Sequence, residues 1–524
     1  MLRTTNHWAA LAALLLATTI LPAHAASAGT GAYGSDYIPN GKCGPFPRAV
    51  VTTPPWACLA IVAGPDDGFT MPRSVIEVSP RRLLVIDMGG WAKNIGRLVE
   101  IRLGEDGSRI VTTLKGGLDR PHGLVLGPDG KVYVGEATVI WRFDPKAAAI
   151  SREVVLDGLP GAGRHPLKTF AFKPDGNMIV NLGAPSDRCE ANSNSLASVQ
   201  YPCPVVEGDA PEASIWLLEF DKPGGVKKSF KPIARGLRNS MALAVSEAGV
   251  IVQGENNVDL RPENDPPEEL NVITAGGNYG WPYCAANGVV PGYGRHFKTC
   301  EKFTKPAVLV PAHSAPLGMM YYHGAMFPPL MGKLIVSLHG YRSNGHRIVA
   351  YDRTDDGRPI APKGPQPAFP FKLVDGWDEL KGVRPQGAPV SISTGTDGQI
   401  WFTEDKNRTV MVLLSGAASA NDPGRKSIPI VVTPAPAGWP TLAQKLVPAC
   451  SQCHEDFRAA GAQAIWARLA QRGWIDQKAV STSKLIHSMR GEAPLKPMPP
   501  PNGIGGLAGG TAALDAFIKS LAKN

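Results

Sequence analysis

The feature that most constrains the fold is a hairpin signature that recurs six times along the chain. In each copy, two short apolar or alternating runs flank a turn whose residues, such as Pro-Asp-Gly, favour the tight bend of a β-hairpin. The six turns lie at 79–80, 128–130, 174–176, 246–249, 329–332 and 396–398. A further strand-like run follows each hairpin, at 96–101, 139–144, 214–221, 269–274, 347–352 and 409–414. Blades of short strands repeated at irregular intervals predict an all-β fold, a six-bladed β-propeller.

The N-terminal residues predict export. Arg3 gives a positive start, residues 9–20 form an apolar run too short to span a bilayer, and residues 23–25 match an A-x-A cleavage site. We therefore expect residues 1–25 to be a secretory signal peptide and the mature protein to be periplasmic or secreted. No later run has the length and apolar character of a transmembrane helix.

The length of 524 residues predicts more than one domain. We expect a lead-in at 26–71, the propeller at 72–416, a Pro- and Ala-rich linker at 417–440 and a small α-helical domain at 441–524. The 58 glycines and 49 prolines suit a protein built of turns and short strands. The net charge of +9 comes from scattered lysines and arginines, which indicates a solvated basic surface or a docking surface for an acidic electron acceptor rather than nucleic-acid binding.

Six of the eight cysteines form three pairs that are close in sequence. Each pair encloses a loop-like segment, and in an exported protein the simplest interpretation is a local disulfide, although the sequence leaves the connectivity open. The pairs are Cys43 with Cys58, Cys189 with Cys203, and Cys284 with Cys300.

The other two cysteines belong to the run Cys450-Ser-Gln-Cys453-His454, which matches the C-x-x-C-H signature of c-type haem attachment. In that chemistry the two thiols form thioethers to the haem and the histidine binds the iron. A chance match and a redox-active disulfide are the alternatives, but the export signal favours haem c and hence a cytochrome c domain.

A sulfur ligand for the second axial position lies downstream. Met498 stands within a Lys-Pro-Met-Pro-Pro run, where small cytochromes c place a thioether that raises the reduction potential. Met489 and His487 are the alternative ligands.

The residues just before the first strand of each blade predict a polar pocket on the propeller axis, because the innermost strands line the central channel. Two insertions, at 184–213 and 258–268, add long loops, which often carry binding residues. Any one of the axial residues alone is more often a solvated loop residue, but their recurrence indicates a site for a multiply anionic ligand. They are Arg73, Arg120, His122, His165, Arg238, Asn239, His313 and Arg384.

Several motifs make the interpretation more specific. They are GLRN at 236–239, ELNVI at 269–273, GGNYGWP at 276–282, APLG at 315–318, YYHG at 321–324 and HGYR at 339–342. This set resembles the soluble sugar dehydrogenases that depend on pyrroloquinoline quinone (PQQ), namely the glucose, aldose-sugar and L-sorbosone type. Fusion to a cytochrome c also occurs in that family.

The resemblance implies a PQQ whose three carboxylates would explain a cationic pocket. His165 matches the catalytic base that takes the hydroxyl proton of the substrate, and a neutral imidazole suits that task. Arg238 and Asn239 match cofactor-binding positions, and looser matching adds His313, Arg342 and Arg384.

The resemblance also implies Ca²⁺ beside the quinone. The stretch that corresponds to the calcium site is Asn256, Asn257 and Val258, whose oxygen atoms suit a hard cation. Two departures concern the base: Arg164 precedes the histidine where the glucose enzymes have an acidic residue, and Ala184 stands where they have an aspartate, with Asp187 close by.

The function expected from these features is oxidation of a sugar or related alcohol or aldehyde, with electrons passed to haem c and then to a soluble or membrane-associated acceptor. A calcium-dependent, lactonase-like hydrolase and a docking module with an electron-carrier domain are the alternatives. The haem signature favours the dehydrogenase, because a hydrolase needs no redox relay.

Overall fold

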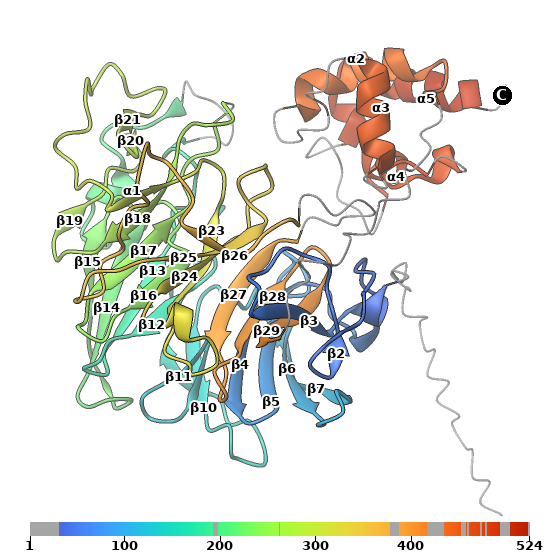
Figure 1. The fold of residues 1–524 in the computed structure, drawn as a ribbon. Helices are drawn as coiled ribbons and strands as arrows, with labels where there is room; N and C mark the ends of the chain where they lie inside the picture. The colour runs from blue at the N-terminus through green and yellow to red at the C-terminus, as the bar shows by residue number, and fades with distance from the viewer. Residues whose placement is uncertain are drawn as a thin grey trace, which may run out of the picture.

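The computed structural model describes residues 31–191, 198–260, 262–377, 387–416, 434–451, 457, 461–471, 474–476, 479–492 and 503–521. Within these ranges, the helices are too short or too polar to cross a bilayer. Figure 1 shows a large group of sheets formed by the N-terminal four fifths of the chain and a group of helices formed by the rest.

Six sheets of four or more strands form the blades of a propeller, which confirms the predicted fold. Blade one holds β4 (Pro72–Ser79), β5 (Arg82–Asp87), β6 (Gly96–Leu103) and β7 (Arg109–Leu118), and blade two holds β8 (Gly123–Leu126), β9 (Val132–Gly135), β10 (Ile140–Phe143) and β11 (Glu153–Leu156). Blade three holds β12 (Phe170–Phe172), β13 (Met178–Leu182), β14 (Ser214–Phe220) and β15 (Lys227–Arg235), with β19 (Gly277–Asn278) added parallel to β15.

Blades four to six follow the same antiparallel order. Blade four holds β16 (Ala242–Val245), β17 (Ile251–Glu255), β18 (Glu268–Val272) and β22 (Val308–Val310). Blade five holds β23 (Pro316–Tyr321), β24 (Leu334–Leu338), β25 (Arg347–Tyr351) and β26 (Phe371–Val374). Blade six holds β27 (Pro389–Thr394), β28 (Ile400–Glu404) and β29 (Thr409–Ser415), and its fourth strand is β3 (Ala57–Ala63).

The sixth blade therefore closes the ring with a strand from the N-terminal side of the chain. β3 pairs antiparallel with β29, from Ala57 opposite Ser415 to Ala63 opposite Val410, and all seven of its residues are buried. This pairing ties the N-terminal side of the chain to the last blade and so holds the ring closed. The sequence interpretation placed 57–63 in the lead-in and missed this strand.

The six predicted turns each connect the first and second strands of a blade, and each predicted third run is the third strand. Apolar clusters between neighbouring blades hold the ring together. The largest lies between blades five and six, where Trp377, Tyr322, Phe327 and Phe402 are fully buried or nearly so.

The three predicted disulfides form with the adjacent connectivity, Cys43–Cys58, Cys189–Cys203 and Cys284–Cys300. Two of them brace a cap over blades three and four that also contains α1 (Pro204–Glu207), β20 (Cys284–Ala285) and β21 (Gly288–Val289). Aromatic side chains around Tyr283 fill this cap. The remaining disulfide joins β3 to the short hairpin of β1 (Lys42–Cys43) and β2 (Phe46–Pro47).

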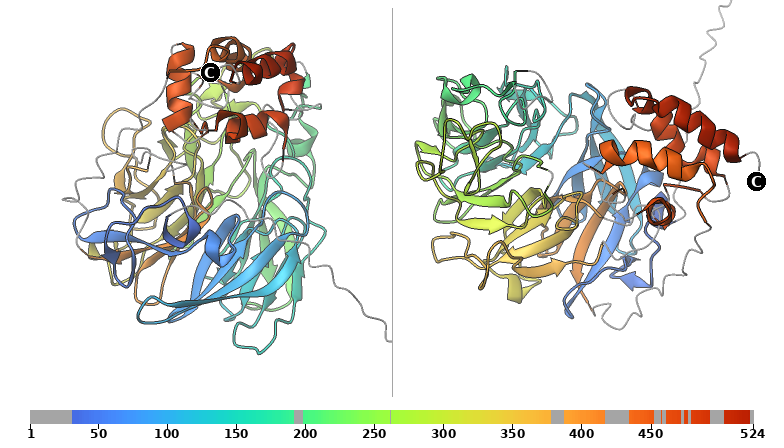
Figure 2. Two further views of the ribbon diagram at one scale, coloured as in Figure 1. Left: turned by 90° about the vertical axis from the view of Figure 1, so that its right-hand side faces the viewer. Right: turned by 90° about the horizontal axis from the view of Figure 1, so that it is seen from above.

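The C-terminal region is helical, as expected. Its helices are α2 (Trp439–Cys450), α3 (Ala462–Gln471), α4 (Lys484–Arg490) and α5 (Gly510–Leu521), and Figure 2 shows them packed on one another. Trp439, Trp466 and Phe517 meet edge-on at the centre, with ring centroids 5.3 to 6.5 Å apart. This region therefore has an apolar core of its own.

The haem-attachment prediction stays a prediction. Cys453, His454 and Met498 lie outside the described residues, and Cys450 ends α2 partly buried against the helical core. Of the alternative ligands, Met489 is buried in that core and His487 contacts the carboxylate of Glu492.

Candidate active site

A polar pocket of about 940 Å³ opens where the first strands of blades one, three, four and five begin. It brings together most of the predicted site: His165, Arg238, Asn239, His313, Arg342, Asn256, Asn257 and Arg73. Arg120 and His122 do not line it, because Arg120 pairs with Asp119 and His122 is buried behind Arg73. Val258 is buried in the aromatic cap instead. Arg384 lies outside the described residues.

His165 stands in the irregular segment that leads into β12. Its Nδ1 lies 2.6 Å from the carbonyl oxygen of Ala184, which can only accept, so Nδ1 carries the proton and Nε2 carries the lone pair. Burial and the charge of Arg238 lower the pKa of His165 to about 3, although Asp187 acts in the opposite direction. The imidazole is therefore neutral at physiological pH and able to accept a proton at Nε2.

Asp187 is the carboxylate that organises this side of the pocket. It forms ion pairs with Arg164 and Arg238, with its Oδ1 2.5 Å from Arg238 Nη2 and 3.8 Å from His165 Nε2. Burial acts to raise the pKa of Asp187, but the charges of Arg238 and Arg164 outweigh it and the pKa is lowered. Asp187 therefore remains ionised and would stabilise an imidazolium at His165.

Arg238 is buried and faces the predicted calcium-binding stretch. Its Nη1 donates to the backbone carbonyls of Asn256 and Asn257 over 2.7 and 3.0 Å. The amide groups of the two asparagines donate to other carbonyls and to Glu269. The oxygens expected to bind Ca²⁺ thus already converge on a cation, the guanidinium of Arg238.

The carboxylates near this point do not complete a metal site. Burial raises the pKa of Glu268 to about 8, and its oxygens accept the backbone N–H groups of Asn257 and Ala315. Among the residues that the structure describes, no cluster of three or more His, Cys, Asp or Glu could hold a metal. In this arrangement the residues do not fit a calcium ion, which would require Arg238 to turn away.

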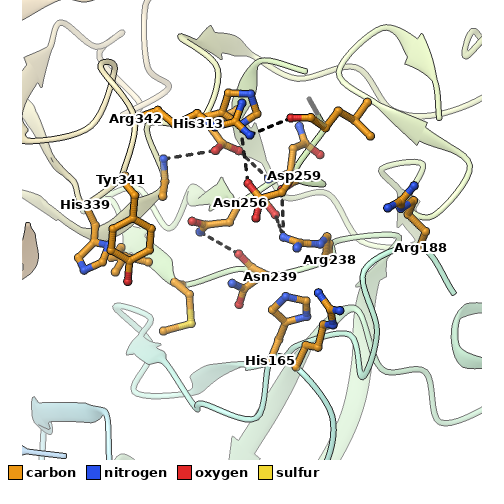
Figure 3. A pocket seen from close by; sticks show the side chains of 18 of the residues that line it. His165, Arg188, Arg238, Asn239, Asn256, Asp259, His313, His339, Tyr341 and Arg342 are labelled. Atoms are coloured by element: carbon orange, nitrogen blue, oxygen red, sulfur yellow. Dashed lines mark hydrogen bonds and ion pairs between the residues drawn. The ribbon is translucent and has the colours of Figure 1, made fainter. Parts of the chain in front are cut away.

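Another part of the wall comes from blades four and five. Arg342 donates to the carbonyls of Leu260 and Pro262 over 3.0 and 3.3 Å, and His313 Nε2 lies 2.8 Å from the same Pro262 oxygen. Figure 3 shows Arg342 and His313 together above Asn256 and Asn239. The printed hydrogen bonds of the Arg342 guanidinium go to backbone oxygens, and its charge also acts on the nearby carboxylate of Asp259, whose pKa is lowered by His313, Arg238 and Arg342 despite burial.

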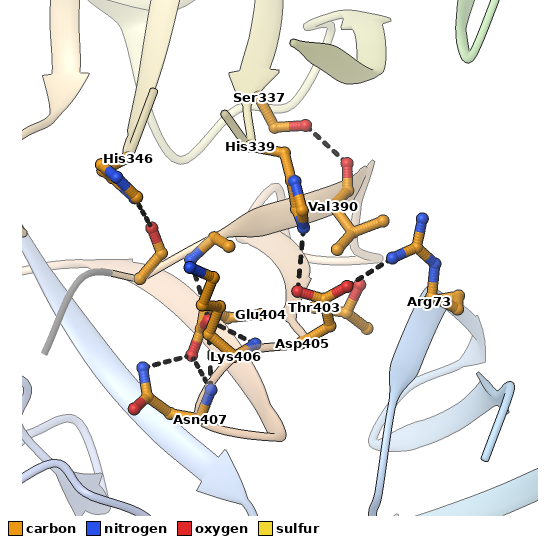
Figure 4. A network of polar contacts seen from close by, with 12 residues as sticks. Arg73, Ser337, His339, His346, Val390, Thr403, Glu404, Asp405, Lys406 and Asn407 are labelled. Carbon is orange, nitrogen blue, oxygen red and sulfur yellow. Dashed lines mark hydrogen bonds and ion pairs between the residues drawn. The ribbon is translucent and has the colours of Figure 1, made fainter. Parts of the chain in front are cut away.

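A buried charge network supports the wall formed by blades one, five and six (Figure 4). Asp405 contacts Arg73 Nη1 and lies 2.9 Å from His339 Nε2, and Arg73 Nε donates to His122 Nδ1 over 3.2 Å. Burial acts to raise the pKa of Asp405, but the charges of His339 and Arg73 lower it to about 2. Arg73 and His339 are thereby held at the pocket surface by an ionised carboxylate.

Sequence reasoning missed His339 and Arg188, which line the pocket, and Asp405, which pairs with His339 and Arg73 behind its wall. His339 and Asp405 follow the second strands of their blades, whereas the predicted axial residues precede the first strands. In an antiparallel hairpin, the residue before the first strand lies next to the residue after the second strand. Two backbone hydrogen bonds show this, one from the His339 N–H to the Ala315 carbonyl and one from the Asn256 N–H to the Asn239 carbonyl. Examining the residues after the second strands as well as those before the first strands would have identified these side chains.

Comparison with known proteins identifies the family. The family model described as TrAA12-like matches residues 52–416. The chain belongs to the TrAA12-like family. A relative from Borreliella burgdorferi (strain ATCC 35210 / DSM 4680 / CIP 102532 / B31), described as an uncharacterized protein, is 33% identical over 345 residues, which cover 57% of this chain and 87% of the relative.

Solved structures support the propeller fold of this TrAA12-like chain. The holo form of the pyranose dehydrogenase PQQ domain from Coprinopsis cinerea has a TM-score of 0.55 at 19% identity, covering 70% of this chain and 98% of that one. The iodide structure of the Trichoderma reesei carbohydrate-active enzyme of family AA12 has a TM-score of 0.53 at 19% identity, covering 72% of this chain and all of the other.

Proposed function

We propose that this protein is a PQQ-dependent dehydrogenase that oxidises a sugar or a related alcohol or aldehyde in the axial pocket. The observation that carries the proposal is His165, a largely buried neutral imidazole whose unprotonated Nε2 faces a pocket with a cationic wall. The family membership and the folds of the structural neighbours, one of them titled as a PQQ domain, support the same function.

The donor groups of the pocket fit a planar ligand with several carboxylates. Arg342 and Asn239 line the pocket, and two buried polar atoms, Arg238 Nε and Asn239 Oδ1, have no hydrogen-bond partner among the described residues. Such atoms favour a polar ligand that completes their bonding. Arg342, Asn239, Arg238 and His313 would hold PQQ, which supplies the acceptor for the hydride that leaves the substrate carbon.

Residues of this chain can accept the proton that the substrate hydroxyl loses. The substrate hydroxyl gives its proton to Nε2 of His165, while the Nδ1–H bond to Ala184 fixes the ring orientation. The resulting imidazolium lies beside the ionised carboxylate of Asp187. The low pKa of His165 then favours release of the proton to solvent, which returns the base to its neutral form.

Calcium is not part of this mechanism, because Arg238 covers the carbonyls predicted to bind it. The calcium prediction itself stays untested. If Ca²⁺ is required, its binding must displace the Arg238 guanidinium, and titration of the protein with PQQ in the presence of Ca²⁺ or of a chelator would detect this.

The proposal extends to electron exit and to location. The C-x-x-C-H run at 450–454 supports covalent haem c, and Cys450 is placed where α2 meets the helical core. A haem in this domain would carry single electrons from the propeller to a soluble or membrane-associated acceptor. The N-terminal signal supports a periplasmic location, where haem attachment takes place.

Reconstitution tests the proposal. Cofactor-free protein is titrated with PQQ, and dye reduction is assayed over aldoses, sorbosone and simple alcohols. His165→Ala should keep PQQ affinity and lose at least ~10² in turnover, as expected for a positioned base. Arg342→Gln should weaken PQQ binding about 10-fold or more through loss of a charge-assisted contact. His323→Ala, a half-exposed histidine outside this pocket, serves as the control and should change neither.

Some results would contradict the proposal. Full activity of His165→Ala on the best substrate would exclude this residue as the base. A wild-type protein that neither binds PQQ nor reduces the dye would contradict the dehydrogenase function. Lactone hydrolysis by the same preparation would then favour the hydrolase, and its absence the docking module.

A further inference from the structure

The cations of the pocket are not equivalent. Five arginines line it: Arg73, Arg164, Arg188, Arg238 and Arg342. Three of them pair with a carboxylate, Arg73 with Asp405 and both Arg164 and Arg238 with Asp187. Arg342 donates to two backbone carbonyls. The Arg188 guanidinium has neither a hydrogen bond nor an ion pair with any residue that the structure describes, and Figure 3 shows it apart from the dashed network.

The backbone of Arg188, in contrast, is firmly held. Its N–H donates to a carboxylate oxygen of Glu190 over 2.5 Å, and its carbonyl accepts the hydroxyl of Tyr293 over 2.7 Å. The next residue is Cys189, in the disulfide with Cys203, and the carbonyl of the preceding Asp187 accepts the indole N–H of Trp281. A partly buried cation on a fixed backbone, without a hydrogen-bonded or ion-paired partner in the described part of the chain, is preorganised for an external anion.

The position of Arg188 indicates which ligand would meet it. It directly follows Asp187, whose carboxylate lies 3.8 Å from the catalytic nitrogen of His165. Arg342 and His313, which we assign to the cofactor, belong to the wall formed by blades four and five, and Figure 3 shows them on the side of the view away from Arg188. Arg188 therefore lies on the side where the hydroxyl that gives up its proton to His165 must sit.

We propose that Arg188 binds a carboxylate in the outer part of this pocket, and that this carboxylate belongs to the substrate, an acidic sugar of the uronate or aldonate class. The inference rests on the proposed function for the identity of the reaction but not for the anion-binding role of Arg188. A guanidinium binds a carboxylate through two parallel hydrogen bonds, and neutral sugars offer no such group. The carboxylate could instead be one of the cofactor's, and the experiment below separates the two sources.

The primary measurement is the ratio of kcat/KM for glucuronate to that for glucose, and of galacturonate to galactose. Wild-type protein should favour the acid of each pair. Arg188→Gln should reduce this preference about 10- to 100-fold, mainly through KM for the acid, with the neutral sugar unaffected. Arg188→Lys should restore part of it, because the charge returns without the two-pronged geometry. Arg295→Gln, an exposed arginine outside the pocket, is the matched control.

A second measurement does not depend on turnover. Isothermal titration of cofactor-free protein with glucuronate should show binding that weakens with added salt and is lost in Arg188→Gln. Titration with PQQ forms the other arm: weaker PQQ binding by Arg188→Gln with an unchanged acid preference would overturn the assignment to the substrate and give the carboxylate to the cofactor.

The inference is overturned if correctly folded Arg188→Gln matches wild type in acid preference, glucuronate binding and PQQ binding. It is also overturned if wild-type protein binds neither glucuronate nor PQQ. Dye reduction with neutral sugars and no effect of Arg188→Gln would leave the proposed dehydrogenase function intact, so the two failures are distinguishable.

Discussion

Replacing Asp187 with asparagine should weaken both the fold around the pocket and catalysis. Asparagine has the shape of aspartate but no charge, so Asp187→Asn removes the carboxylate that pairs with Arg164 and Arg238 and that lies near His165. Arg238 is only 4% exposed, so its guanidinium would become a buried cation without a direct anionic partner.

The size of each effect follows from these contacts. Leaving a buried charge without its partner typically costs 3–5 kcal/mol. Arg238 keeps its bonds to the carbonyls of Asn256 and Asn257, and the new amide oxygen still accepts, so we expect a loss of roughly 2–3 kcal/mol. Asp187 also raises the pKa of His165, and without it the imidazole becomes a weaker base and the imidazolium loses its counter-charge. We therefore expect turnover to fall by about 10- to 100-fold.

Denaturant unfolding and steady-state kinetics of the reconstituted enzyme measure these two effects. Asp175→Asn is the matched control, because Asp175 pairs with Lys173 in an exposed turn of the same blade. PQQ affinity, measured separately, shows whether the loss of turnover reflects an empty site. A folded Asp187→Asn protein with wild-type stability and wild-type turnover at saturating PQQ would refute the assignment of Asp187 as the residue that organises the base.

Three further predictions concern other parts of the molecule. The kcat/KM of the reconstituted enzyme should stay level between about pH 4 and pH 8, because burial and Arg238 lower the pKa of His165 to about 3 and the base is deprotonated throughout; an acid limb near pH 6.5 would contradict this. Lys168→Met should lower the free energy of unfolding by about 2–4 kcal/mol, measured with denaturant, because the buried amino group, whose pKa burial lowers to about 7, donates to the carbonyls of Pro160 and Pro166 and the variant leaves both unsatisfied. Met498→Ala should leave haem attached but lower its reduction potential, because a neutral thioether favours ferrous iron; an unchanged potential in redox titration would move the ligand to Met489 or His487.

The strand pattern could be predicted wherever it depends on local chemistry. Each first hairpin is specified by its own turn, as at Pro174, Asp175 and Gly176 between β12 and β13. The outer strands are harder to predict from sequence, because a strand such as β7 has one face in solvent and its sequence resembles that of a polar loop. The pairing of β3 with β29 joins residues more than 300 positions apart, and nothing local to 57–63 reveals its partner.

The departures from the sugar dehydrogenase pattern also receive a physical explanation from the structure. An arginine before the base, Arg164, would by itself add a second positive charge beside Arg238 and disfavour protonation of His165. Asp187, three residues after Ala184, forms ion pairs with both arginines and lies near the imidazole. The insertion at 184–213 thus supplies the carboxylate beside the base, and it also supplies Arg188, whose guanidinium pairs with none of the described residues. One loop would thus set both the protonation of the base and the charge of the substrate that reaches it, so exchanging this loop between family members should change pH dependence and acid preference together.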